Sequence, residues 1–494
     1  MRFAIGSLIV ILFTAATTAV AGLLQFKQLA AEISVTPPIK HADVTRATPG
    51  KPQTLLLIGS DHRAGEPFKA ANTDTMMLVR LNASSRTINL LSVPRDLRVQ
   101  IPEGGVPVTD RLNAAYSIGG PNLLVRVISH QVFPGIRINH IVDVNFGGFR
   151  DLVNAIGCVY TDVDHRYYNN TVYTDYSSID IQPGYQRLCG ATALAFVRFR
   201  HTDSDLVRNA RQQDFLRWAK AQFGSSYLFD HRNRLVRIFG AHTQTDADLH
   251  SIDGLINLFN LVAFSAGHTI KQIPFPAIFL PCGTQPGAVL GAACYVTADA
   301  AAERRAFREF ITPTQAPSHP ASDRHHHPHR HRYVAANATS DQADGQAQAA
   351  ALHRPRMPVY YPRVIAPGSS YCVGSAGNCP LETASPGSYP RAYTIRDRSG
   401  RRHAAYRMTL ALNPVLGEYY GVQGTTWLHP PILYKETGIR VVHGRRLQLY
   451  SGGGKVSLVA WRTRRAVYWI SNTLTDTLSP GQMVAIAASL KRAT

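Results

Sequence analysis

The chain has 494 residues, with 52 Lys and Arg against 32 Asp and Glu and a net charge of +20. Apolar residues make up 45% and charged residues 17%, which excludes a disordered or fibrous chain and a protein with many membrane spans. The length allows two to four domains. Nine of the cationic residues are Lys and 43 are Arg. Arg suits anionic partners because its rigid fork binds phosphate and carboxylate, but GC-rich codons would give the same bias. Composition alone therefore does not select a function.

The N-terminus predicts export. Residues 4–24 form an uncharged apolar run, about the length that a membrane-spanning helix needs. Ala19-Val20-Ala21 also matches a signal-peptide cleavage site. We predict an N-terminal transmembrane anchor over 1–25, with a cleaved signal peptide as the alternative, and a tether over 26–52. The expected location is the cell membrane, single-pass, with the rest of the chain extracytoplasmic.

Six cysteines fall into three close pairs, and none lies in a CxxC motif. In an exported chain this indicates three disulfides rather than a zinc or redox site, although six cysteines allow 15 pairings. The close pairs are Cys158 with Cys189, Cys282 with Cys294, and Cys372 with Cys379.

Residues 53–305 alternate between strand and helix patterns. This alternation predicts an α/β fold with a central, mostly parallel or mixed sheet between helical layers, a three-layer α/β/α domain. The expected strands are 53–59, 75–81, 87–93 and 138–146, and the expected helices are 119–133, 147–155 and 205–223.

Residues 306–356 are rich in His, Ala and Pro, which predicts a disordered linker, and we favour a solvated basic tract over a metal site for its histidines. Residues 357–494 form a smaller α+β C-terminal domain of unknown role. Its expected strands are 446–450, 455–461 and 466–471, and its expected closing helix is 481–490. The aromatic residues Trp427, Trp461, Tyr468 and Trp469 could stack on sugars, but a core position is favoured.

Charged side chains gather at predicted strand ends, where open α/β sheets bind ligands. Asp61 follows the first strand, Asp74 precedes the second, and Arg95 and Asp96 stand where the third strand ends.

A second group of charges surrounds residue 200. Arg198 and Arg200 alternate on a stretch expected to be extended, so both would point the same way. Arg208, Arg211 and Gln212 share one side of the helix predicted to follow. A pyrophosphate between these groups would relieve the repulsion of like charges, whereas a buried salt-bridge network is the purely structural alternative.

Phosphoryl transfer fits both groups of residues, because its catalyst mainly positions reactants and neutralises phosphoryl oxygens with Arg and a divalent cation. Mg²⁺ prefers one or two carboxylates together with phosphate oxygens and water. Asp61 and Asp74 are therefore the expected ligands for Mg²⁺, with Mn²⁺ as a possible substitute.

Six ordered segments resemble the LytR–CpsA–Psr family over roughly residues 53–225, with weaker similarity to about 300. They are IGSDHR, NTDTMMLVRL, INLLSVPRDLRVQIP, DRLNAAYSIGG, INHIVDVNFGGF and ALAFVRFRHTDSDLVRNARQQ. The resemblance implies a membrane-anchored, Mg²⁺-dependent transferase. Such an enzyme moves a glycopolymer from a polyprenyl-pyrophosphate carrier onto peptidoglycan and forms a phosphodiester bond.

The resemblance also implies roles for individual residues. Asp61 and Asp74 match the metal-site carboxylates, and Arg95, Asp74 and Asp96 match the catalytic centre, where Asp96 either supports Arg95 or acts as a base. The residues that match the pyrophosphate-binding set are Arg63, Arg95, Arg198, Arg200, Arg208, Arg211 and Gln212. This chain departs from the family pattern at Arg111, where Lys is common, and around Cys158.

Two alternatives stand beside this interpretation, and a third is not expected. A polyprenyl-pyrophosphate pyrophosphatase would use the same residues with water as the acceptor, and an envelope scaffold would bind anionic polymer without catalysis. A nucleic-acid partner is not expected, because most of the chain is exported and no recognition motif is present.

The lipid tail of the polyprenyl carrier would need an apolar tunnel. Val127, Ile128 and Phe133 could line it, although a position in the ordinary hydrophobic core is favoured for these residues.

Overall fold

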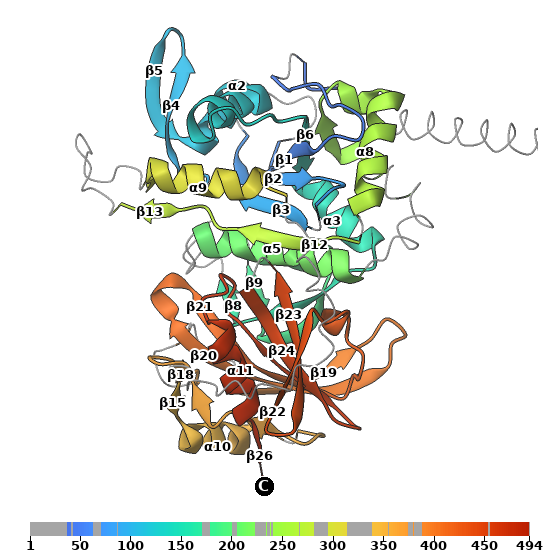
Figure 1. The fold of residues 1–494 in the computed structure, drawn as a ribbon, viewed down its shortest axis with the longest axis vertical. Helices are drawn as coiled ribbons and strands as arrows, with labels where there is room; N and C mark the ends of the chain where they lie inside the picture. The colour runs from blue at the N-terminus through green and yellow to red at the C-terminus, as the bar shows by residue number, and fades with distance from the viewer. Residues whose placement is uncertain are drawn as a thin grey trace, which may run out of the picture. The chain divides into compact units, whose positions relative to one another are not determined.

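The computed structural model describes residues 37–40, 43–62, 71–85, 87–169, 178–199, 205–222, 234, 238, 241–265, 267–280, 295–313, 338–353, 355–373, 379, 388–452 and 455–493. The chain divides into two compact units (Figure 1). The first consists of residues 1–155, 225–268 and 276–314, and the second of residues 156–224, 269–275 and 315–494. The predicted anchor, the Cys282 and Cys294 pair and the His-rich tract lie outside the described residues. Within the described residues, no helix is long and apolar enough to cross a membrane.

The first unit is built on a mixed sheet whose strands follow the order β11–β6–β1–β2–β3. Strand β1 pairs antiparallel with β2 and parallel with β6, so the sheet is mixed and the predicted α/β fold class is confirmed. Leu56, Ile58, Leu78 and Leu91 are almost fully buried, which explains the apolar runs in the sequence. The strands are β1 (Gln53–Ser60), β2 (Thr73–Leu81), β3 (Thr87–Ser92), β6 (His140–Asn145) and β11 (Thr243–Thr245).

Helices α2, α8 and α9 of this unit pack against strands β2 and β3. Helix α2 begins seven residues before the predicted start and has non-helical backbone at Gly119 and Gly120. The Gly-Gly-Pro sequence therefore kinks this helix instead of opening it, because Gly120 adopts a positive φ of 64°. The helical elements are α2 (Leu112–Val127), its π-helical continuation (Ile128–Val132), α3 (Phe146–Ala155), α8 (Ile252–Ser265) and α9 (Ala300–Ile311).

A hairpin that the sequence analysis missed joins β3 to α2. Strands β4 (Arg98–Glu103) and β5 (Val106–Arg111) pair antiparallel around Gly104 and Gly105. Both glycines have positive φ, 56° and 97°, as a two-residue hairpin turn requires. The two prolines of the hairpin, Pro102 and Pro107, lie opposite each other. The hairpin starts at Arg98, two residues after the predicted site residue Asp96.

The second unit joins residues 156–224 to the C-terminal region. Its largest sheet has eight strands, in the order β18–β20–β21–β25–β24–β23–β22 with β19 paired to β20. These strands are β18 (Ser370–Tyr371), β19 (Arg391–Arg396), β20 (Arg402–Asn413), β21 (Glu418–Thr425), β22 (Gly438–Val442), β23 (Arg445–Gly452), β24 (Lys455–Arg462) and β25 (Val467–Ser471). The earlier segment contributes β7 (Val159–Val163), β8 (Tyr167–Asn169), β9 (Ile179–Ile181), β10 (Gly184–Leu188), α4 (Gly190–Arg198) and α5 (Asp205–Gln222).

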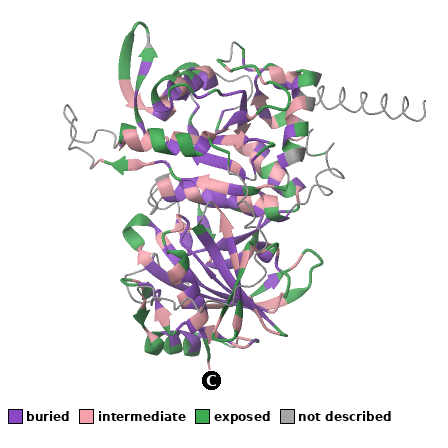
Figure 2. Cartoon of the chain, in the orientation of Figure 1, coloured by how far each residue is buried: buried purple, intermediate pink, exposed green. Residues whose placement is uncertain are grey.

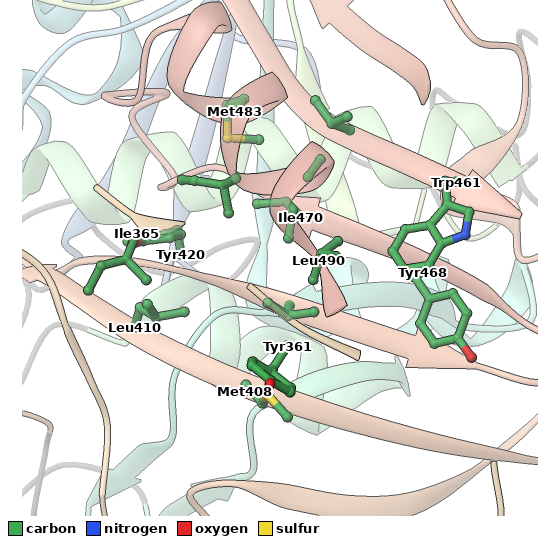
Figure 3. Packing of buried hydrophobic residues seen from close by; sticks show 14 of the residues in the cluster. Tyr361, Ile365, Met408, Leu410, Tyr420, Trp461, Tyr468, Ile470, Met483 and Leu490 are labelled. Carbon is green, nitrogen blue, oxygen red and sulfur yellow. The ribbon is translucent and has the colours of Figure 1, made fainter. Parts of the chain in front are cut away.

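Aromatic and aliphatic side chains fill the core between the C-terminal sheet and helix α11 (Pro480–Ser489) (Figure 3). The rings of Trp461 and Tyr468 stack with centroids 4.6 Å apart. These two residues and Trp469 are buried, so they serve the core rather than an exposed sugar-stacking face. The burial pattern in Figure 2 shows the same concentration of buried residues in this sheet.

Part of the predicted linker is ordered. Residues 306–311 complete helix α9, and helix α10 (Gln342–Ala351) packs on the C-terminal core through Ala349. The prediction of disorder is therefore wrong for these residues. Gly345 explains the close packing, because a Cβ there would come within 2.8 Å of the Pro362 carbonyl oxygen.

Two of the three predicted disulfides are present in the described residues. Cys158 bonds to Cys189 and Cys372 bonds to Cys379, both within the second unit. The first of these bonds ties the start of β7 to the residue that precedes α4.

Candidate active site

Asp61 and Asp74 lie at the same end of the first unit's sheet. The antiparallel ladder places Ser60 opposite Thr73, and the Asp61 amide donates to the Asn72 carbonyl oxygen at 3.1 Å. The Asp61 carboxylate is exposed and accepts a hydrogen bond from the Asn72 amide at 2.5 Å. The pairing of β1 with β2 therefore brings together two carboxylates that stand 13 residues apart in the sequence.

Arg95 connects this carboxylate pair to Asp96. Its Nη1 donates to the Asp74 carboxylate, and its Nε lies 3.7 Å from the buried Asp96 Oδ2. On the other side, Arg111 Nη1 lies 3.7 Å from Asp96 Oδ1. A backbone hydrogen bond at the base of the hairpin helps to hold these residues in place, since the Asn113 amide donates to the Arg95 carbonyl oxygen at 3.0 Å. Acidic and basic groups thus alternate along the site, and Arg111 joins it without having been predicted.

Asp143 is a buried carboxylate beside this site that the sequence analysis also missed. Its Oδ1 accepts from the Ser60 hydroxyl at 2.7 Å and its Oδ2 accepts from the Tyr116 hydroxyl at 2.5 Å. The pKa of Asp143 is raised to about 6, mainly by burial; the nearby charge of Asp61 adds to this rise, and the two hydrogen bonds and His62 oppose it. Burial also raises the pKa of Tyr116, so its hydroxyl remains a hydrogen-bond donor. The sequence did carry a signal for this residue, because an aspartate within the apolar strand sequence HIVDVN indicates a buried carboxylate.

The second predicted group of site residues, the charges around residue 200, lies on α4 and α5 of the second unit. Arg198 is the last residue of α4, so the expectation of an extended stretch there is wrong. The short Ala- and Gly-containing segment forms a helix, consistent with the high helix propensity of Ala. Arg208, Arg211 and Gln212 on α5 are almost fully buried, with at most 6% of each residue exposed.

Arg211 and Gln212 bind the carbonyl groups that the end of α4 leaves without helical partners. Arg211 Nη1 donates to the carbonyl oxygens of Phe196 at 3.1 Å and Phe199 at 2.8 Å. Gln212 Nε2 donates to the Val197 carbonyl oxygen at 3.1 Å. A cation at a helix C-terminus is also favoured by the helix dipole. These two residues therefore hold the end of α4, whose last residue is Arg198.

The predicted ligand contacts remain predictions. The first unit brings together Asp61, Asp74, Arg95 and Asp96, and the second brings together Arg198, Arg208, Arg211 and Gln212. Arg63 and Arg200 lie outside the described residues. The suggested tunnel residues Val127, Ile128 and Phe133 are fully buried, as core residues are. No cluster of three or more His, Cys, Asp or Glu that could hold a metal occurs among the residues described.

The first unit is thus an α/β domain with a charged site of carboxylates and arginines at its strand ends. A LytR_cpsA_psr family model matches residues 21–300, more than half of the chain, and the chain belongs to that family. This confirms the resemblance inferred from the six motifs.

Curated relatives match a smaller part of the chain. The Bacillus subtilis polyisoprenyl-teichoic acid–peptidoglycan teichoic acid transferase TagT is 35% identical over 172 residues, covering 34% of this chain and 52% of the relative. The probable cell wall biosynthesis protein LcpB of Corynebacterium glutamicum is 34% identical over 173 residues, covering 32% of this chain and 39% of the relative. The chain thus spans about half or less of these relatives. The crystal structure of B. subtilis TagV aligns with a TM-score of 0.41 and 24% identity, over 54% of this chain and 100% of that one.

Proposed function

We propose that the protein is a membrane-anchored phosphotransferase that moves a glycopolymer from a polyprenyl-pyrophosphate carrier onto peptidoglycan through a phosphodiester bond. The observation that carries this proposal is the cluster of Asp61, Asp74, Arg95 and Asp96 at one end of the first unit's sheet. Membership of the family and the transferase activity of the TagT relative support the same chemistry. The apolar segment 4–24 supports the anchoring.

The carboxylates of the cluster suit Mg²⁺ or Mn²⁺. Asp61 is exposed, and the Asp74 side chain is 16% exposed and has Arg95 as its counter-ion. Two carboxylates that are not fully buried match the preference of Mg²⁺ for one or two carboxylates together with phosphate oxygens and water. Asp61 and Asp74 would hold the ion, and its chemistry there is to neutralise charge on the phosphoryl oxygens.

The residues of the chain bind and orient the pyrophosphate. Arg95 exchanges part of its pairing with Asp74 for phosphate oxygens, and charge-assisted bonds of this kind are stronger than neutral ones. Asp96 is buried and contacts both Arg95 and Arg111, so we assign it to holding Arg95 rather than to accepting a proton. Two adjacent cations make a carboxylate a weak base.

The reaction replaces one phosphorus–oxygen bond with another. A peptidoglycan hydroxyl attacks the phosphorus nearer the sugar and forms the new phosphodiester bond. The bond from that phosphorus to the bridging oxygen breaks, and the bridging oxygen leaves with the bond's electron pair as part of polyprenyl phosphate. The hydroxyl proton is lost to solvent on the exposed side of Asp61.

A transfer assay with the full chain in detergent micelles tests the proposal. The donor is a polyprenyl-pyrophosphate-linked saccharide, the acceptor is peptidoglycan, and the assay measures both released polyprenyl phosphate and saccharide bound to the acceptor. We expect Mg²⁺-dependent transfer that falls at least 100-fold in Arg95→Ala and in Asp74→Asn, because loss of one transition-state charge contact costs about 3 kcal/mol. Arg126→Ala removes an exposed cation on α2 and is the matched control.

Other outcomes separate the alternatives. Release of polyprenyl phosphate with no saccharide on the acceptor would favour the pyrophosphatase. Neither product from folded protein would favour a scaffold that binds polymer without catalysis.

A further inference from the structure

Arg407 on β20 is buried in an ion pair with a residue of the family-matched part of the chain. Its side chain is fully buried, and its Nη1 donates to Asp162 Oδ1 on β7 at 3.2 Å. The same nitrogen donates to the Ser471 hydroxyl at 2.9 Å, and Trp469 Nε1 donates to Asp162 Oδ2 at 3.2 Å. Two strands of the C-terminal sheet therefore fix one carboxylate on a segment more than 240 residues earlier.

The contacts continue at the end of β7. Asp164 follows this strand, and its carbonyl oxygen accepts from the Thr409 hydroxyl at 3.1 Å and from Arg407 Nη2 at 3.5 Å. The Asp164 carboxylate in turn accepts a hydrogen bond from the Tyr167 hydroxyl at 2.6 Å. The position of Tyr167 is thereby tied to residues 407 and 409 of the C-terminal sheet.

Tyr167 holds Arg211 on α5. Arg211 Nε donates to the Tyr167 hydroxyl at 3.2 Å, and its guanidinium lies 4.5 Å from the centre of the Tyr167 ring. Arg211 then binds the carbonyl oxygens at the end of α4, as described above. A continuous chain of buried polar contacts thus runs from Arg407 to the helix end that carries Arg198.

A second set of contacts fixes α5 nearer its C-terminus. Arg217 Nη1 donates to the Ser457 hydroxyl of β24 at 2.6 Å. The Gln222 side chain exchanges two hydrogen bonds with the backbone of Tyr160, at 2.8 and 2.7 Å. The Tyr160 hydroxyl donates to the Arg396 carbonyl oxygen at 2.8 Å. Both halves of α5 are therefore attached to elements held by the C-terminal sheet.

Stability alone does not account for a buried ion pair of this kind. Removing two charges from water is costly, and well-packed apolar residues of similar volume are often as stabilising or more so. A polar network does, however, fix directions and distances that apolar packing leaves adjustable.

We propose that the C-terminal sheet is a working part of the transferase, in which Arg407 is a positioning residue. Through Asp162, Asp164 and Tyr167 it sets Arg211 and the end of α4, and so aims Arg198 at a pyrophosphate. This inference rests on the proposed function for its ligand. The contact chain itself can be tested without the ligand.

The experiment uses the full chain in detergent micelles with three readouts. They are the Kd for inorganic pyrophosphate with Mg²⁺ by calorimetry, hydrogen exchange of residues 190–212, and kcat and KM for transfer. The variants are Arg407→Met, the conservative Arg407→Lys and the milder Thr409→Val. Arg440→Met is the control, because Arg440 is exposed on β22 of the same sheet.

We expect Arg407→Met to weaken pyrophosphate binding at least 10-fold and to speed exchange in residues 190–212. We expect KM to rise in the same variant, Arg407→Lys to recover part of the affinity, and Arg440→Met to behave as the unaltered protein. Folded Arg407→Met with unchanged affinity and unchanged exchange would overturn the proposal. If that variant does not fold, unchanged affinity and exchange in Thr409→Val would overturn it equally.

The two proposals fail differently. If the unaltered protein binds no pyrophosphate and transfers nothing, the proposed function is wrong, and exchange in residues 190–212 alone decides whether Arg407 positions α4. If the unaltered protein binds and transfers while the Arg407 variants match it, only the positioning role is wrong.

Discussion

Replacing Asp143 with Asn should remove a pH dependence of stability from the first unit. The buried carboxyl has a pKa of about 6 in the folded protein against an ordinary value of 3.8. Between these pH values the folded state binds more protons than the unfolded chain, so stability falls as pH rises. The whole effect is about 3 kcal/mol, of which about 2 kcal/mol falls between pH 4 and 7.

Hydrogen exchange of the β6 peptide measures this effect locally, without mixing in unfolding of the second unit. The opening free energy of β6 in Asp143→Asn, relative to the unaltered protein, should increase by about 2 kcal/mol from pH 4 to 7. Asp253→Asn, which alters an exposed carboxylate on α8 of the same unit, should show no such trend. If the difference in opening free energy between Asp143→Asn and the unaltered protein stayed constant from pH 4 to 7, the effect assigned to burial of this carboxyl would be wrong.

Two further predictions concern the second unit. The double variant Cys158→Ser, Cys189→Ser removes a disulfide between residues 31 apart in the sequence, so we expect the free energy of unfolding to fall by about 3–4 kcal/mol. Its melting temperature should be lower than that of the oxidised parent, and an unchanged melting temperature would contradict this. Gly184→Ala should cost about 1–3 kcal/mol, because Gly184 has φ of 114° and a Cβ would come within 2.4 Å of the Tyr393 hydroxyl. In a Tyr393→Ala background, which removes the ring atoms that lie within 2.4–2.9 Å of the new Cβ, the cost of Gly184→Ala should fall to its backbone part, as denaturant titration can measure.

Much of the first unit followed from local patterns. The runs at 53–59 and 87–93 are β1 and β3 almost to the residue, because buried strands need short apolar runs with clear ends. The hairpin β4–β5 was missed because its apolar positions are few and Pro102 and Pro107 suggest a loop. The C-terminal strands β23, β24 and β25 were also predicted, since each is a short run rich in apolar and aromatic residues.

The site was predictable only in part. Asp61, Asp74 and Arg95 carry their signal at strand ends, and pairing of neighbouring strands brings them together. Asp143 lies 69 residues beyond Asp74, and nothing local shows that its partners are Ser60 and Tyr116.

By itself, the sequence determined the family, the α/β fold class and the residue types of the site, because these depend on short-range patterns and ordered motifs. The tertiary structure alone decided that Asp143 is buried with a raised pKa and that Arg211 binds backbone carbonyls. It also decided that residues 156–224 form one unit with the C-terminal sheet. The physical reason is that burial and long-range hydrogen bonding, such as that of Arg407 with Asp162, depend on which distant segments meet.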